Sequence, residues 1–180
     1  MSNLVKGSSL VLDLSYLQET PSSLAGLIET CTRRAGRQPP LTPSAFKDIL
    51  ETKRFTSKKA DCKLVITMYT RAYERKLANK DVLNYQGLGW SDAEACTLAK
   101  ALSGAPSVRE IHLQGNAHIS DVGVDALTEA LANAEVAPKL THIYLGQHNR
   151  ASAEARQSLE DVLKKRRERM KLERLCGGKA

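Results

Sequence analysis

The stretch IHLQGNAHISDVGVDALTEAL, residues 111–131, combines the sequence patterns of three backbone conformations. It begins with apolar residues at alternate positions, which is typical of a half-buried strand. A Gly-Asn pair follows, as in a tight turn, and the stretch ends with leucines at helical spacing. We therefore predict a short strand, a turn and a helix in this stretch.

The same pattern occurs three times along the chain. Its helical part, ISDVGVDALTEAL (119–131), aligns with WSDAEACTLAKAL (90–102) at an offset of 29 and with ASAEARQSLEDVL (151–163) at an offset of 32. Repetition at this period predicts stacked strand–helix units, because no single copy can bury its apolar face alone. The strand positions that align are apolar in every copy: Leu83 and Tyr85, then Val108, Ile111 and Leu113, then Leu140, Ile143 and Leu145.

This strand, Gly/Asn turn and helix resemble the leucine-rich repeat, specifically the long-helix class typified by ribonuclease inhibitor. The resemblance covers residues 80–163, and the signature L-x-x-L-x-L-x-x-N is complete only at Val108–Asn116. Leu88 and His148 occupy the asparagine position in the other copies, with Asn149 one residue late. The resemblance implies an α/β fold, a short leucine-rich-repeat solenoid of about three strand–helix repeats.

Each predicted helix of the repeat region starts at a serine, and in two copies an aspartate follows it. Ser91 with Asp92 and Ser120 with Asp121 fit a capped helix start, where the carboxylate lies at the positive end of its own helix. Ser152 occupies the same position in the third copy.

Residues 1–79 do not join the repeat and are expected to form a helical N-terminal cap region. Helices are predicted over 21–34, over 44–52 after the Thr42-Pro43 start signal, and from Ser57 onward. The third helix should cover the first repeat, whose edge is otherwise exposed, and a separate helical domain is the alternative. Its apolar stripe consists of Leu64, Val65, Met68, Tyr69, Ala72, Tyr73 and Leu77.

The basic charge of the chain is concentrated at its C-terminal end. Residues 164–180 hold eight Lys/Arg and two Glu and so carry six of the seven net positive charges. The helix of the third copy should continue to Leu175 as a basic C-terminal helix, because no Gly or Pro precedes Gly177. Its candidate partner-binding residues are Lys164, Lys165, Arg166, Arg167, Arg169, Lys171 and Arg174.

An acidic protein surface is the preferred partner for this basic helix. A calmodulin-like groove that binds Leu163 and Met170 is one form of it, and a solvated helix that aids solubility is the alternative without a partner. Nucleic acid is the weaker candidate, because the rest of the chain is almost neutral and no stacking aromatics accompany the charges.

The second candidate surface is the concave sheet face that the resemblance implies, formed by residues between the inward-pointing positions. Glu110 should lie beside His142, because neighbouring strands are about 4.8 Å apart. His112 should lie between Asn84 and Tyr144 for the same reason. The candidate partner-binding residues of this concave face are Asn84, Gln86, Glu110, His112, Gln114, His142 and Tyr144.

All four histidines, His112, His118, His142 and His148, lie in the strand–turn segments of the second and third copies. Two of them with Glu110 could bind zinc, although ordinary surface pairing accounts for them without a metal. No phosphate-binding glycine loop, nucleophile elbow or helical pair of metal-ligand histidines is present in the sequence. We therefore predict no catalytic residue, no cofactor and no metal.

These observations predict a non-enzymatic protein-binding module, an adaptor or structural subunit of a larger assembly. The alternative is regulation of a GTPase or a metal-binding activity on the concave sheet, since some long-helix members of the resembled family regulate GTPases. No apolar run is long enough to span a bilayer, and the N-terminus lacks a secretory signal. Four scattered cysteines, Cys31, Cys62, Cys96 and Cys176, predict reduced thiols and a cytoplasmic location.

Overall fold

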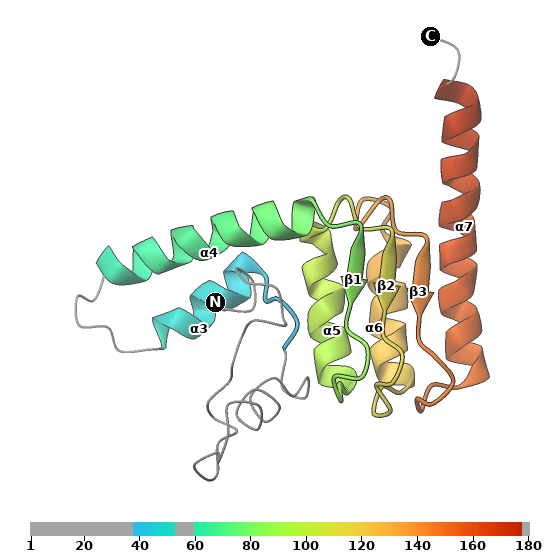
Figure 1. The fold of residues 1–180 in the computed structure, drawn as a ribbon, viewed down its shortest axis with the longest axis horizontal. Coiled ribbons are helices and arrows are strands. Elements are labelled where there is room, and N and C mark those ends of the chain that lie inside the picture. Colours follow the sequence, from blue (N-terminus) through green and yellow to red (C-terminus); the bar gives the residue numbers. More distant parts are fainter. Residues whose placement is uncertain (1–37, 53–59, 178–180) are drawn as a thin grey trace, which may run out of the picture.

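The structure is a computed structural model that describes residues 38–52 and 60–177 (Figure 1). The helix predicted over 21–34 lies outside the described residues. In chain order the elements are α3 (Pro43–Glu51), α4 (Ala60–Ala78), β1 (Val82–Asn84), α5 (Asp92–Ala101), the 3-10 helix η3 (Leu102–Gly104), β2 (Glu110–His112), α6 (Asp121–Ala132), β3 (His142–Tyr144) and α7 (Ala153–Gly177).

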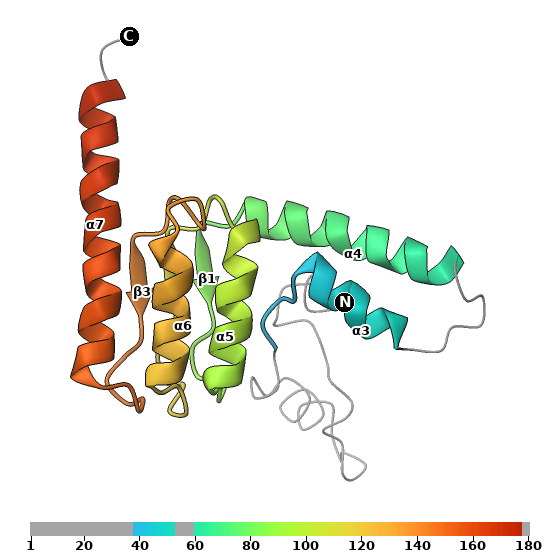
Figure 2. The same ribbon diagram turned by 180° about the vertical axis from the view of Figure 1, so that it is seen from behind.

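The three strands form one parallel sheet in the order β1-β2-β3, with Leu83, Ile111 and Ile143 in register. Figures 1 and 2 show α5 and α6 side by side on one face of the sheet, and α7 packs next to α6. Among the described residues, no helix covers the opposite face. The sheet is therefore buried on one face and open on the other.

The prediction of a strand–helix solenoid is wrong. The described chain is mostly helical, with five α-helices and one small sheet that does not curl (Figure 1). Solenoid curvature accumulates from a small rotation at each repeat, and three strands of three residues each are too few and too short to build it. Much of the helical content lies in α4 and α7, which extend beyond the sheet (Figure 1).

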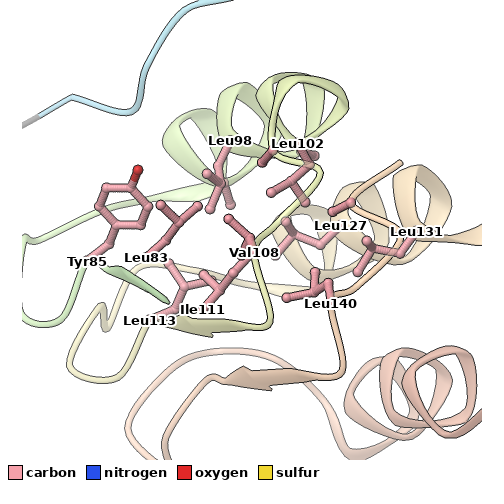
Figure 3. Packing of buried hydrophobic residues seen from close by; sticks show 14 of the residues in the cluster. Leu83, Tyr85, Leu98, Leu102, Val108, Ile111, Leu113, Leu127, Leu131 and Leu140 are labelled. Atoms are coloured by element: carbon pink, nitrogen blue, oxygen red, sulfur yellow. The ribbon is translucent and has the colours of Figure 1, made fainter. Parts of the chain in front are cut away.

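The core lies between the sheet and α5 and α6, and Figure 3 shows leucines of both helices pointing at the strands. Val108, Ile111 and Leu113 are fully buried, which confirms the inward positions predicted for this strand. Leu127 of α6 is fully buried as well. The alternating apolar residues of the strand and the helically spaced leucines within residues 111–131 therefore form the two sides of one packed interface.

The side chain of Asn116 is buried and ties two neighbouring turns together. Its Oδ1 accepts hydrogen bonds from the backbone N–H groups of Leu88 and Trp90, at 3.1 and 3.0 Å. Its Nδ2 donates to the carbonyl oxygens of Tyr85 and Leu113, at 2.9 and 2.8 Å. Four hydrogen bonds thus satisfy a buried amide that would otherwise destabilise the fold.

The aspartates in the first turns of α5 and α6 also hydrogen-bond the start of the next helix. Asp92 Oδ1 accepts from the backbone N–H groups of Ser120 and Gly123, at 2.7 and 3.0 Å, and Oδ2 accepts from Ser120 Oγ at 2.7 Å. Asp121 Oδ1 accepts from the N–H of Ser152 at 2.5 Å. The predicted positions in the first turns of α5 and α6 are confirmed. Each carboxylate also hydrogen-bonds the start of the following helix, so these residues lock neighbouring units together.

At the N-terminal side, α3 begins as predicted, with Thr42 accepting from Ala45 N at 3.2 Å and Pro43 in the first turn. The stripe predicted on α4 is only partly buried. Tyr69 and Tyr73 are buried with Leu77, whereas Leu64 and Met68 are 59% and 54% exposed. The first half and middle of α4 lie beside α3, where Tyr69 stacks on Phe46, and its second half contacts η3 (Figure 2).

Candidate protein-binding surfaces

α7 is one continuous helix, as predicted, and its first half packs against α6. Ala155, Leu159 and Leu163 are buried in this contact. The spacing of four residues between them places all three on one side of the helix. The next residue on that side is Arg166, and it is buried too.

Arg166 is only 4% exposed and is surrounded by backbone carbonyls. Its Nε and Nη2 donate to the Leu131 oxygen at 2.9 and 2.6 Å, and Nη1 donates to Ala137 at 3.0 Å. Nη2 also donates to the oxygens of Asn133 and Val136, at 2.7 and 3.0 Å. All these carbonyls lie at the end of α6 or in the loop after it, where a helix leaves its last acceptors without partners.

The assignment of Arg166 to a partner-binding surface needs correction, because its side chain belongs to the interior. Burial lowers its pKa, and the positive charge of Arg169 lowers it further. The guanidinium keeps its proton all the same, since an arginine remains charged in proteins. The buried charge is compensated by the negative end of the α6 dipole.

Two further arginines continue this attachment at the rim of the contact. Arg167 Nη1 donates to the Thr141 oxygen at 2.9 Å, and its other terminal nitrogen pairs with Glu160. Arg169 reaches toward the Pro138 oxygen at 3.5 Å and lies 3.4 Å from a carboxylate oxygen of Glu173. Both side chains are partly buried and engaged within the chain, so they are less available to a partner than the sequence predicted.

The basic residues that remain free on the described part of α7 are Lys164, Lys165 and Lys171, all exposed. The side chain of Arg174 lies outside the described residues. Leu172 and Leu175, in contrast, are 61% and 68% exposed. Figure 1 shows this end of α7 extending past the loops that precede the strands.

The calmodulin-like alternative on Leu163 and Met170 does not fit this geometry. Leu163 is 1% exposed and packs in the core, and Met170 is half-buried. The apolar residues that a partner can reach on α7 are the two leucines further along the helix.

The backbone register of the open sheet face is the predicted one. Glu110 pairs with His142, and His112 lies between Asn84 and Tyr144. Asn84, His142 and Tyr144 are exposed, while Glu110 and His112 are half-buried. The row predicted from the strand spacing is thus brought together on one surface.

The side chains on this face pair differently from the backbone. A Glu110 carboxylate oxygen lies 3.4 Å from His112 Nε2, and the Gln86 amide nitrogen lies 3.2 Å from His112 Nδ1. The His142 ring instead has Thr141 Oγ1 at 2.9 Å from its Nδ1. The predicted backbone neighbours Glu110 and His142 are therefore confirmed, while the Glu110 carboxylate contacts His112 on its own strand.

Aromatic rings extend the open face over β3. The His112 and Tyr144 ring centroids are 4.7 Å apart, and those of His142 and Tyr144 are 6.0 Å apart. Gln114 contributes less to this surface, since its Oε1 is buried without a hydrogen-bond partner among the described residues. In the part of the chain that the structure describes, no group of three or more His, Cys, Asp or Glu side chains could hold a metal ion.

Sequence reasoning missed the structural role of two arginines. Arg156 donates to the Gly146 carbonyl at 2.7 Å and also contacts Asn149. These two contacts of Arg156 hold the last turn before α7. Arg166 extends the helical spacing of Leu159 and Leu163, and this spacing was the available signal. A basic residue in phase with a buried leucine stripe indicates an arginine that faces the body of the protein.

No family model, no curated protein and no solved structure matches this chain. The resemblance to the leucine-rich repeat therefore stays a prediction from the aligned residues. Within residues 38–52 and 60–177, none of the helices combines the length and the apolar character needed to cross a membrane.

Proposed function

We propose that this chain is a non-enzymatic protein-binding module that serves as an adaptor or structural subunit of a larger assembly. The observation that supports this function is the contrast along α7. Its base is fixed by Leu163 and Arg166, whereas its end exposes Leu172 and Leu175. Large apolar side chains that stay exposed in the described part of the chain are a mark of protein–protein contact.

We propose an acidic protein surface as the partner of α7. Lys164, Lys165 and Lys171 are exposed along the helix from its base to its end, so a complementary negative surface would steer the encounter and set its register. Nucleic acid has less support, because residues 153–177 contain no aromatic side chain on which bases could stack. Regulation of a GTPase on the sheet has less support still, because three short strands offer only a small surface. Metal binding there has less support as well, because the described residues hold no group of three or more His, Cys, Asp or Glu side chains that could bind a metal ion.

The open sheet face is a second surface that suits the same function. Exposed Tyr144 and His142 offer aromatic and hydrogen-bonding contact area without a charged cluster. We further propose that the protein works in the cytoplasm. The free thiols of Cys62, Cys96 and Cys176 suit a reducing compartment.

Charge reversal on α7 tests the proposed function in the full-length chain. The variant Lys164→Glu/Lys165→Glu/Lys171→Glu changes exposed residues only. Its matched control, Lys76→Glu/Lys80→Glu/Lys100→Glu, changes the net charge equally at exposed positions elsewhere. A deletion of residues 164–180 would be a poor test, because it removes Arg166 from the fold.

The immobilised protein is incubated with an extract of its native source, and bound proteins are quantified by mass spectrometry at increasing salt. The wild type and the control should retain an acidic protein, and the amount of this protein that the α7 variant retains should be about tenfold lower. Three reversed contacts of a few tenths to one kcal/mol each add up to this factor. Equal retention by both variants would contradict the proposal.

A further inference from the structure

We infer that the end of α7 is a helical ligand that places Leu172 and Leu175 in an apolar groove with an acidic rim on a partner protein. The inference rests on the proposed function and adds its binding mode. It identifies the apolar contact of the complex, which charge alone does not supply.

Helix geometry separates the two sides of α7. Leu172 lies nine residues after Leu163, which is about two and a half turns, so the two side chains point to opposite sides. Leu163 is 1% exposed against the body, and Leu172 is 61% exposed on the far side. Leu172 therefore belongs to a face of α7 that is not buried within residues 38–52 and 60–177.

Leu175 strengthens this face. It lies three residues after Leu172, so the two side chains are neighbours on the helix surface. At 68% exposed it is the more accessible of the two. Leucines three residues apart match the first two of the i, i+3, i+4 and i+7 anchors by which an amphipathic helix enters a hydrophobic groove.

The charges around the leucines define the partner. Lys165 lies seven residues before Leu172, which is nearly two full turns and so on the same side. Lys164 and Lys171 are also seven residues apart and line the flank of that side. A groove with carboxylates along its rim complements these three exposed lysines. Glu168 lies between them and is also exposed, so the partner residue opposite it should be neutral or basic.

A second copy of this chain is a poor occupant. Pairing two α7 ends would place the same lysines opposite one another, and like charges at an interface oppose association. A membrane surface is also a poor fit, because two leucines bury little area and stable anchoring needs more. Both occupants are separate outcomes of the test.

Photo-cross-linking at the leucine position tests the groove directly. A benzoylphenylalanine replaces Leu172 in the full-length chain, and a control chain carries it at Val122 of α6, which is 63% exposed. Each is irradiated in an extract of the native source, and cross-linked peptides are sequenced by mass spectrometry. We expect position 172 to yield a partner segment with apolar residues next to several Asp or Glu. Cross-links to another copy, to lipid or to nucleic acid would overturn the inference, as would no excess over position 122.

A variant pair separates this inference from the proposed function. Leu172→Ser/Leu175→Ser should weaken binding of the cross-linked partner about tenfold or more, while Val122→Ser/Met68→Ser, changed at exposed positions, should not. Circular dichroism and thermal unfolding should match the wild type in both. If the lysine reversals weaken binding and the leucine pair does not, the groove is wrong and the function stands. If only the leucine variant weakens binding, the acidic rim is wrong. If neither the leucine variant nor the lysine variant weakens binding, both proposals fail.

Discussion

The helices α4 and α7 flank the sheet on opposite sides and perform the same task by different chemistry (Figures 1 and 2). Each provides hydrogen-bond donors to carbonyls at the C-terminal end of the neighbouring helix. Tyr73 of α4 donates its hydroxyl to the Ala101 oxygen, the last residue of α5, at 2.7 Å. Arg166 of α7 donates five hydrogen bonds, two of them to the Leu131 oxygen near the end of α6.

The difference follows from how the two helices end. α5 runs into η3, whose first residue Leu102 already donates its backbone N–H to the carbonyls of Leu98 and Ala99, so one hydroxyl completes the end. α6 ends at Asn133 in an extended conformation, which leaves several carbonyls pointing at α7. A guanidinium has five N–H donors in a planar fork and suits that cluster, whereas a hydroxyl has one. A helix end with more free acceptors thus needs a charged side chain.

The largest effect is expected at the arginine. Arg166→Ala should lower the free energy of unfolding by about 3 kcal/mol, because buried carbonyls lose their donors and a cavity forms. Arg166→Met keeps much of the apolar stem and should lower the free energy of unfolding by about 2 kcal/mol. This loss measures the contribution of the guanidinium hydrogen bonds without that of the stem. Urea unfolding followed by circular dichroism measures both. A loss below about one kcal/mol in Arg166→Ala would mean that α7 is held by its leucines alone.

On the tyrosine side, the closest approach is at Gly104, and it predicts the next largest effect. A Cβ built on Gly104 would lie 2.3 Å from Tyr73 Cε1 and 2.7 Å from its hydroxyl oxygen. Gly104→Ala should therefore cost about 2 kcal/mol, since the buried ring cannot move without giving up its hydrogen bond. Thermal unfolding of Gly104→Ala, alone and combined with Tyr73→Ala, is the measurement. Additive losses in the double variant would show that the alanine does not meet the ring.

The sequence predicts the parts of this molecule that depend on period and spacing. Val108, Ile111 and Leu113 alternate because a strand presents every second residue to one face, and all three are buried. The register of Glu110 with His142 follows from aligning two copies. The expectation of a curved solenoid failed because curvature depends on how many units stack and at what angle, which local spacing does not contain.

Side-chain partners were harder to predict than backbone neighbours. The Glu110 carboxylate contacts His112 rather than His142, because its rotamer decides which of two neighbours on the same face it meets. Arg166 was assigned to the surface because a charged residue in a basic run is usually solvated. Its acceptors lie about 30 residues away in the chain, at the end of α6, and no local pattern places them there.

Between the two flanking helices, carboxylates join neighbouring units, and this predicts an acid-sensitive centre. Burial raises the pKa of Asp92, but hydrogen bonds from Ser120 and Gly123 and the charge of Arg150 outweigh it, so the pKa lies below its usual value. A lowered pKa in the folded state gives stability above the unfolded value, about 3.9 for Asp, and this stability is lost as pH falls through the folded pKa.

Asp92→Asn should cost about 1 kcal/mol at neutral pH and flatten the fall in stability on the acid side of pH 4. The measurement is urea unfolding of both proteins between about pH 2 and 7, at constant salt. Asp125→Asn, at an exposed position of α6, is the control and should keep the wild-type profile. Parallel acid profiles for wild type and Asp92→Asn would show that other carboxyls dominate.

The smallest expected effect is at Tyr73, and it measures the tyrosine side of the comparison. Tyr73→Phe removes one hydroxyl–carbonyl bond without emptying the site, so it should cost about 1 kcal/mol at neutral pH.

Burial raises the pKa of Tyr73 to about 12, with the neighbouring tyrosines Tyr69 and Tyr85 adding to it. A raised pKa in the folded state gives stability below the unfolded value of about 10, and this stability is lost as pH rises toward 12. The wild type should therefore weaken with alkali more steeply than Tyr73→Phe, and thermal unfolding at pH 8 to 11 detects the difference. Arg166 does not titrate in this window, so α7 should stay attached while α4 loosens. If both proteins lose stability in parallel, the Tyr73 hydroxyl does not cap α5.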